Sequence, residues 1–219
     1  MATSSIATQV GTFNADFTRK IGPSLSGVFN REQAELSQVG TPGEAVSVGD
    51  KLPDAKLTGA DGTAVTLFEF LGTGSTVLVF YRGAWCPYCN ITLRTYQQEL
   101  LPLLQQRGDT LIAISPQTAD RSAAAVDGGE LQFAVLSDEG NLLAQQLGIV
   151  TAPSAQARAA HTELGFDVAD SDADSTAAIP FPTVLIVDAS GVVRFVDVHV
   201  DYTTRTEVAD IVEALSSRG

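Results

Sequence analysis

Cysteine, histidine, tryptophan and methionine are all scarce in this chain: its 219 residues include two cysteines, two histidines, one tryptophan and one methionine. Two cysteines are too few for the disulfide framework of a small extracellular scaffold. His161 and His199 are the only histidines, and their spacing suits a zinc site of two cysteines and two histidines badly. We therefore predict no metal centre.

Positive charge is also scarce, because 13 lysines and arginines face 26 aspartates and glutamates, which gives a net charge of −13. Nucleic acids and anionic membranes bind basic patches, so the charge balance argues against either partner. No apolar run approaches the ~18 residues of a membrane-spanning helix. The first residues, MATSSIATQVGTFNADF, lack the basic segment and apolar block of a secretory signal, so we expect a cytoplasmic protein.

The most informative stretch is Thr76–Leu93 (TVLVFYRGAWCPYCNITL), which predicts a buried strand, a sharp turn and the start of a helix. Cys86 and Cys89 form a C-x-x-C motif, which beside a strand–helix pattern indicates a redox-active dithiol. Pro87 suits the first helical turn, so Cys86 is predicted to cap the helix, where unpaired N–H groups and the helix dipole stabilise a thiolate. Cys89 then lies on the same face and is able to form a disulfide with Cys86.

The charges around the motif agree with this interpretation. No Asp or Glu lies between Glu69 and Glu99, and Arg82 and Arg94 are the only charged residues in that window. Keeping carboxylates away from the cysteines favours a thiolate, and Arg82, the nearest cation in sequence, is predicted to lower the pKa of the attacking cysteine. Two inert core cysteines and half of a zinc site are the alternatives, and the cap position and the spacing favour redox chemistry over both.

The rest of the chain alternates helical and strand patterns. Apolar residues from about Val10 to Leu36 recur with a helical period that is interrupted at Gly22-Pro23. Strands are predicted at 55–57, 65–66, 76–81, 110–115, 133–136, 183–187 and 192–200. Helices are predicted at 67–71, from Pro87 to Gly108 with a kink at Pro102, at 118–126 with an end at Gly128-Gly129, at 141–147, at 153–164, and after a capping box at Thr204-x-x-Glu207.

The order of these elements predicts a thioredoxin-like α/β fold, with a central mixed sheet flanked by helices. We divide the chain into an N-terminal helical extension (1–45) and a thioredoxin-like domain (46–219). Pro182, directly before the strand at 183–187, is predicted to face the C-x-x-C motif and to have a cis peptide bond. Residues 166–178 contain a D-x-D-x-D run, but lack the glycine and glutamate of a calcium loop, so we interpret them as a solvated acidic loop.

Five segments occur in the order found in one known family: FYRGAWCPYCN, LIAISPQTAD, AVLSDEGNLLAQQLGI, FPTVLIVDASGVVRF and HVDYTTRTE. Together they resemble the peroxiredoxin-like branch of the alkyl hydroperoxide reductase and thiol-specific antioxidant superfamily. The resemblance implies a thioredoxin-type fold and a thiol-dependent oxidoreductase, above all a peroxidase for hydrogen peroxide or alkyl hydroperoxides. It also implies that the enzyme has no cofactor, takes electrons from a thioredoxin-like donor or glutathione, and is a candidate homodimer. The site residues that it implies are Cys86 and Cys89, supported by Arg82, Trp85, Pro87 and Pro182.

The chain departs from the P-x-x-x-T-x-x-C pattern of true peroxiredoxins. On that pattern Cys89 takes the peroxidatic position, Cys86 that of the threonine and Arg82 that of the proline. Pro182 stands where peroxiredoxins bring an arginine from a later strand. The two hydrogen-bond donors that would orient a hydroperoxide, the threonine and this arginine, are therefore absent. Each such donor is worth ~2.7–4 kcal/mol, and Arg82 compensates in part. We predict that Cys86, as the more exposed sulfur, attacks protein disulfides, and that Cys89 forms a sulfenic acid with peroxide.

Two other functions stay open at this point. The CPYC motif resembles that of glutaredoxins, so a thioredoxin- or glutaredoxin-like reductase of protein disulfides is the first alternative. The length of the chain and the absence of a Gly-Gly pair after the PFPT strand argue against glutaredoxin itself. The second alternative is a non-enzymatic, redox-sensing interaction domain that binds a partner through its acidic surface.

Overall fold

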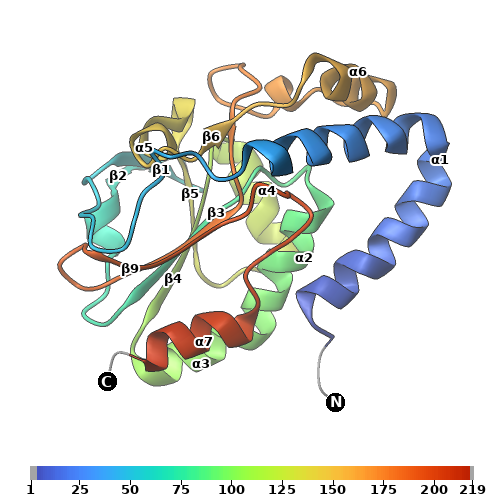
Figure 1. Cartoon of the computed structure of the whole chain (residues 1–219). Coiled ribbons are helices and arrows are strands. Elements are labelled where there is room, and N and C mark those ends of the chain that lie inside the picture. Colours follow the sequence, from blue (N-terminus) through green and yellow to red (C-terminus); the bar gives the residue numbers. More distant parts are fainter. Residues whose placement is uncertain (1–3, 218–219) are drawn as a thin grey trace.

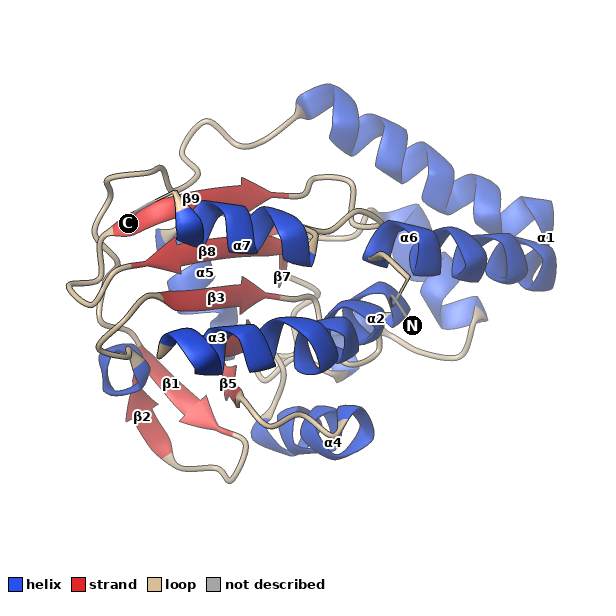
Figure 2. Ribbon diagram, turned by 90° about the horizontal axis from the view of Figure 1, so that it is seen from below, coloured by secondary structure: helices blue, strands red, loops and turns tan. Residues whose placement is uncertain are grey.

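The computed structural model describes residues 4–217 and has a mixed seven-stranded sheet at its centre (Figures 1 and 2). The predicted domains, 1–45 and 46–219, therefore each have one end outside the described residues. The strand order is β2-β1-β5-β4-β3-β8-β9, and β6 and β7 form a small second sheet. The bounds are β1 Lys56–Gly59, β2 Ala64–Thr66, β3 Thr76–Phe80, β4 Thr110–Ser115, β5 Ala134–Ser137, β6 Val150–Thr151, β7 Ile179–Pro180, β8 Thr183–Val187 and β9 Val193–Val198.

The pairing of the strands confirms the predicted thioredoxin-like arrangement. Strands β3, β4 and β5 are parallel neighbours, β8 is antiparallel to both β3 and β9, and β1 is antiparallel to β2 and β5. The connection from β3 through helices to the parallel β4 is the predicted crossover. The end of β3 and the start of β8 lie side by side, with Phe80 opposite Thr183. Arg82 and the cysteines follow this end of β3, and Pro182 directly precedes β8.

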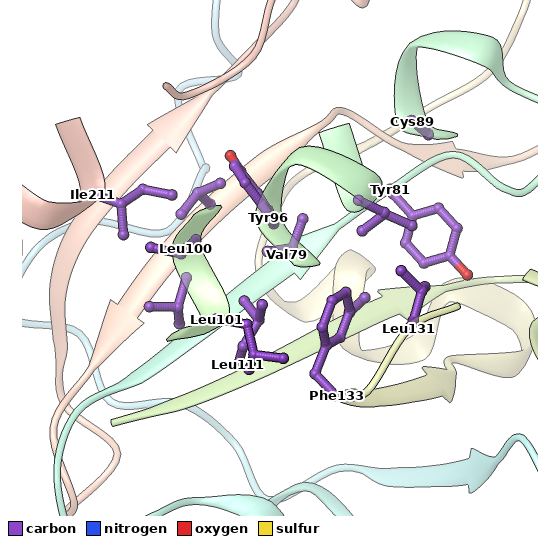
Figure 3. Packing of buried hydrophobic residues seen from close by; sticks show 14 of the residues in the cluster. Val79, Tyr81, Cys89, Tyr96, Leu100, Leu101, Leu111, Leu131, Phe133 and Ile211 are labelled. Atoms are coloured by element: carbon purple, nitrogen blue, oxygen red, sulfur yellow. The ribbon is translucent and has the colours of Figure 1, made fainter. Parts of the chain in front are cut away.

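Strand β3 is buried on both faces, as its continuous apolar run predicts. Val77 and Val79 pack into one layer of the core, and Leu78 and Phe80 into the other, because successive side chains of a strand point to opposite faces. The first layer contains both cysteines and is covered by α2, α3 and α7, as Figure 2 shows. In Figure 3 Cys89 and Tyr81 lie at one end of this layer and Ile211 lies at the other.

The helices follow the predicted order. They are α1 Ile6–Val39, α2 Pro87–Thr95, α3 Leu101–Arg107, α4 Ala119–Gly129, α5 Leu142–Gln146, α6 Ala155–Glu163 and α7 Val208–Ser216, with 3₁₀ turns η1 Leu67–Phe70, η3 Glu139–Asn141 and η4 Val168–Asp170. A π-helical turn, η2 Tyr96–Leu100, joins α2 to α3 in place of the predicted kink at Pro102. The wide turn accommodates a proline that has no N–H to donate, and Pro102 lies in the first turn of α3.

Helix α1 is bent at Gly22 into two arms, which confirms the interruption predicted at Gly22-Pro23. Gly22 has φ 77° and ψ 172°, and Pro23 lacks the N–H that would continue the helical hydrogen bonds across the bend. Figure 1 shows the two arms at a steep angle to each other. The first arm contacts α2 through Phe13 and Tyr88, and the second contacts α6 through Phe29 and His161.

One predicted helix start is wrong. The capping box of α7 is formed by Glu207 and Asp210, whereas Thr204 belongs to the preceding turn, in which its hydroxyl donates to the carbonyl of Asp201. The predicted end of α4 is confirmed: its last residue is Gly129, and Glu130 caps the helix with a left-handed φ of 51°.

The acidic segment at 166–178 is less solvated than predicted. Asp170 and Asp174 are exposed, but Asp172 is buried, and neither of its carboxylate oxygens has a hydrogen-bond partner among residues 4–217. Burial, and then the charge of Asp174, raises the pKa of Asp172 to about 8. No helix in the described part of the chain combines the length and apolar character needed to cross a membrane.

Candidate active site

The turn between β3 and α2 fixes where the cysteines lie. Gly83 has φ 144°, and a Cβ added to it would lie 2.5 Å from Nε1 of Trp85, so the turn requires glycine here. The backbone N–H of Ala84 donates to Oε1 of Gln117 at 2.7 Å, and Nδ2 of Asn90 donates to the carbonyl of Ala84 at 2.8 Å. One bond from the loop between β4 and α4 and one from α2 therefore hold the turn in one conformation.

Helix α2 begins as the sequence predicts. Cys86 occupies the N-cap with φ −87° and ψ 112°, Pro87 lies in the first helical turn, and Cys89 follows within that turn. Both cysteines are free thiols.

The expected exposure of the dithiol is wrong, since both cysteines are 0% exposed. The first arm of α1 and a set of aromatic side chains cover the start of α2: Tyr88 contacts Phe13, and its hydroxyl donates to Asn14 at 2.7 Å. The prediction that Cys86 is the more exposed sulfur assumed an open helix cap and did not include this cover. The two sulfurs differ instead in what they face.

Cys86 borders a cavity of about 760 Å³ between α1 and the start of α2, together with Arg82, Trp85 and Pro87. Cys89 borders a separate void of about 10 Å³, together with Pro182 and Arg205. Of the residues that the sequence singled out, Arg82, Trp85 and Pro87 thus border the cavity with Cys86, and Pro182 borders the void with Cys89.

Arg205 is the site residue that sequence reasoning missed. Its Nη2 donates to the sulfur of Cys89 at 3.2 Å, and its Nη1 donates to the carbonyl oxygens of Tyr202, at 2.6 Å, and Thr204. The residue lies in the segment HVDYTTRTE, which contributed to the family resemblance, but no spacing rule connects it to a cysteine 116 positions earlier.

Arg82 is buried beside the other sulfur, as 4% of it is exposed. Its Nη1 lies 4.0 Å from the sulfur of Cys86, and its guanidinium carbon lies 4.8 Å from the ring centre of Trp85 and 4.1 Å from that of Tyr202. Cation–π contacts of this kind hold a desolvated guanidinium in place.

The electrostatic environment favours a thiolate on Cys89 rather than on the helix cap. Burial raises the pKa of Cys89, but the hydrogen bond from the Cys86 thiol and the charges of Arg205 and Arg82 outweigh it, so the pKa lies well below its usual value. Burial, and then the hydrogen bond and charge of Cys89, raises the pKa of Cys86. The pair therefore shares one proton, which stays on Cys86.

Pro182 borders the void beside Cys89, but the predicted cis bond is wrong, because residues 4–217 contain no cis peptide bond. The chain on both sides of Pro182 is held extended: Phe181 donates its N–H to Ile149 at 2.7 Å, and His199 donates to the carbonyl of Pro182 at 2.9 Å. A trans proline suits this extended path. In the same described range no group of three or more His, Cys, Asp or Glu side chains is placed to hold a metal ion.

The model of the AhpC/TSA family matches residues 48–196, which include both cysteines, Arg82 and Pro182. This chain belongs to the AhpC/TSA family. It is accordingly a thiol-dependent oxidoreductase of the peroxidase type. The match ends before Arg205 and begins after α1, so both lie outside the part shared with the family model.

Solved structures similar to this AhpC/TSA protein are peroxiredoxins. They include reduced Prx3 of Vibrio vulnificus in complex with hydrogen peroxide (20% identity, 78% of this chain and 99% of that one, TM-score 0.62). Another is the peroxidoxin BcpB of Mycobacterium tuberculosis (20% identity, 78% of this chain and 96% of that one, TM-score 0.59). A third is a peroxiredoxin-like protein of Aquifex aeolicus (15% identity, 79% of this chain and 88% of that one, TM-score 0.61). At these identities the likeness shows the shared fold. No curated protein sequence matches the chain significantly.

Proposed function

We propose that this chain is a thiol peroxidase in which Cys89 attacks the peroxide and Cys86 resolves the product. The observation that supports this assignment best is the 3.2 Å contact between Nη2 of Arg205 and the sulfur of Cys89. A fixed cation beside a buried sulfur keeps it ionised, and the thiolate is the form that attacks peroxides. The void at Cys89, about 10 Å³, has room for about one water-sized group, so the outer oxygen of a peroxide is the part that fits against this sulfur.

The proposed cycle uses both cysteines in turn. The Cys89 thiolate attacks the outer oxygen of the peroxide, the O–O bond breaks, and Cys89 becomes a sulfenic acid while the released alkoxide or hydroxide takes the proton of Cys86. The Cys86 thiolate then attacks the sulfur of Cys89 and expels hydroxide, which forms the Cys86–Cys89 disulfide. An external thiol or dithiol donor reduces that disulfide without a bound cofactor.

A cytoplasmic location fits this cycle because the disulfide has to be reduced after each turnover, and the cytosol supplies reduced thiols. Complete burial of both sulfurs disfavours the first alternative, a reductase of protein disulfides, since a folded substrate has no route to either sulfur while α1 is docked.

Single serine variants test the assignment. With hydrogen peroxide, Cys86→Ser is expected to accumulate a sulfenic acid, Cys89→Ser is expected to form none, and the unmodified protein is expected to lose two hydrogens by mass as its disulfide forms. Donor-dependent peroxide turnover is expected in the unmodified protein, and reduction of insulin disulfides is not. Sulfenic acid in Cys89→Ser but not in Cys86→Ser would overturn the assignment, as would insulin reduction without peroxide turnover.

A further inference from the structure

The cavity beside Cys86 is much larger than the peroxide that the proposed function requires. Its volume is about 760 Å³, and we call it the α1 cavity because both arms of α1 line it, through residues such as Phe17 and Phe29. Aromatic rings from the other side of the site, including those of Trp85, Tyr88 and Tyr202, complete its walls. A space of this size and lining is typical of sites that bind small organic molecules.

Only one of the two sulfurs faces this cavity. Cys86 borders it, whereas Cys89 borders the separate void that contains Arg205. Cys86 keeps its proton in the reduced protein, so it is a poor nucleophile toward a molecule in the cavity. In the oxidised protein, however, Cys86 is the disulfide sulfur that an incoming thiolate in the cavity meets first.

The charges that line the α1 cavity favour an anion. Arg82 and Lys20 face one acidic residue, Asp201, in a protein whose net charge is −13. Arg82 is buried, and no carboxylate of the described residues pairs with it. His161, a further lining residue, adds no positive charge at neutral pH, because burial and the nearby Arg82 lower its pKa to about 4. An unpaired, desolvated guanidinium 4.0 Å from a reactive sulfur is suited to bind a carboxylate next to that sulfur.

We propose that the α1 cavity binds a low-molecular-weight thiol that carries a carboxylate, and that this thiol, rather than a protein dithiol, reduces the Cys86–Cys89 disulfide. The inference rests on the proposed peroxidase cycle, of which it names the electron donor. Cover by α1 supports the small donor. Cys86 is 0% exposed, so any donor has to move side chains in front of the sulfur, but a thiol that fits the cavity leaves α1 in place, whereas a folded protein would have to displace the helix.

The reduction takes two exchange steps. The donor thiolate attacks the sulfur of Cys86, the disulfide bond breaks, and Cys89 leaves as a thiolate stabilised by Arg205. A second donor thiolate attacks the donor sulfur of the mixed disulfide, which releases the oxidised donor. Cys86 then takes up one proton, and the pair returns to its starting state.

The test measures the reduction of protein oxidised with diamide, so that it does not depend on the reaction with peroxide. Reduced glutathione, which has two free carboxylates, is compared with glutathione diethyl ester, which has the same thiol and none, and with a reduced thioredoxin. We expect glutathione to react about tenfold faster than the ester, as a charge-assisted contact to one carboxylate allows. Equal rates for glutathione and its ester, or faster reduction by thioredoxin, would overturn the proposal.

Three variants locate the effect. Arg82→Gln is expected to lower the glutathione rate to that of the ester, and Lys20→Gln, an exposed change that does not endanger folding, is expected to lower the ratio of the two rates several-fold. Lys56→Gln removes an equal charge from an exposed position of β1, outside the cavity, and is expected to keep the ratio. A ratio that neither Arg82→Gln nor Lys20→Gln changes contradicts the proposal. If the protein is oxidised normally by peroxide but glutathione and its ester reduce it equally fast, the donor proposal fails and the peroxidase assignment stands. If glutathione is faster than its ester but peroxide does not oxidise the protein, only the peroxidase assignment fails.

Discussion

Arg205 is held in a single orientation beside Cys89. Besides its bond to the sulfur, the guanidinium donates to two backbone carbonyls of its own turn, at Tyr202 and Thr204. A donor that is fixed before the reaction stabilises charge on the sulfur without the cost of reorienting water. On this argument the arginine missing at Pro182 is replaced by one from a later turn, and Arg82 is left free to act on the other side of the dithiol.

We predict that Arg205→Gln raises the pKa of Cys89 and slows the oxidation of this cysteine. The loss of one such donor costs ~2.7–4 kcal/mol, so we expect the rate with hydrogen peroxide to fall by about a hundredfold. The pH dependence of alkylation by iodoacetamide gives the pKa, and its midpoint is expected to move upward. Arg194→Gln, which removes an exposed arginine paired with Asp188 on the β8–β9 hairpin, is the control and is expected to change neither quantity. An unmoved midpoint in Arg205→Gln would show that its charge does not act on Cys89.

The sequence predicts the reacting residues better than it predicts their environment. The helix cap at Cys86 and the place of Pro87 follow from local rules, and the structure has both. The contact of Arg205 does not follow from any local rule, because the β8–β9 hairpin brings its turn to α2 from 116 positions away. The same limit bears on the low pKa of Cys89. Local reasoning finds the helix dipole at Cys86 and the charge of Arg82, but the hydrogen bond from the Cys86 thiol and the charge of Arg205 lower that pKa more, and Arg205 arrives through tertiary structure.

At the scale of elements, strands and helices with strong periodic patterns are predicted to within a few residues. The strand at 110–115 has the predicted bounds, and the break in α1 occurs at the predicted glycine. The errors concern features that packing decides, namely the isomer of Pro182 and the first residue of α7. Both features depend on which residues pack against Pro182 and against the start of α7, and local sequence patterns do not predict those contacts.

Helix α1 yields a prediction that separates backbone conformation from packing. Gly22→Ala places a Cβ in open space but at φ 77° and ψ 172°, a conformation that only glycine adopts readily, so it is expected to lower the free energy of unfolding by about 1–3 kcal/mol. Gly11→Ala is the matched control, since it also places a Cβ in open space, but in regular helix, where alanine is more favourable than glycine by roughly 0.5–1 kcal/mol. Urea unfolding measures both. Equal changes in the two variants would mean that the bend at Gly22 does not constrain the helix.

At the scale of the whole molecule, segments from both ends of the chain enclose the dithiol. Glu207 accepts hydrogen bonds from the backbone N–H groups of Ile6, at 3.0 Å, and Ala7, at 2.8 Å, at the start of α1. Oε1 of Gln33, in the second arm, accepts the N–H of Tyr202 at 3.0 Å. The turn that supplies Arg205 is therefore fastened to the helix that covers Cys86. Both α1 and this turn lie outside residues 48–196, the part matched by the family model.

The attachment of α1 by Glu207 should consequently control how fast a bulky reagent reaches the thiols. Glu207→Gln removes a negative charge that stabilises the N-terminus of α1 by about 1 kcal/mol. Because the helix then opens more often, we expect labelling by 5,5′-dithiobis(2-nitrobenzoate) to become roughly fivefold faster. Iodoacetamide is smaller and is expected to gain less, and the pH midpoint of its reaction is expected to stay in place because Arg205 is unaltered. Glu213→Gln removes the same charge from an exposed position of α7 and is expected to leave both rates unchanged. If Glu207→Gln lowers the stability of the protein and yet leaves the bulky reagent no faster, α1 is not the barrier in front of Cys86.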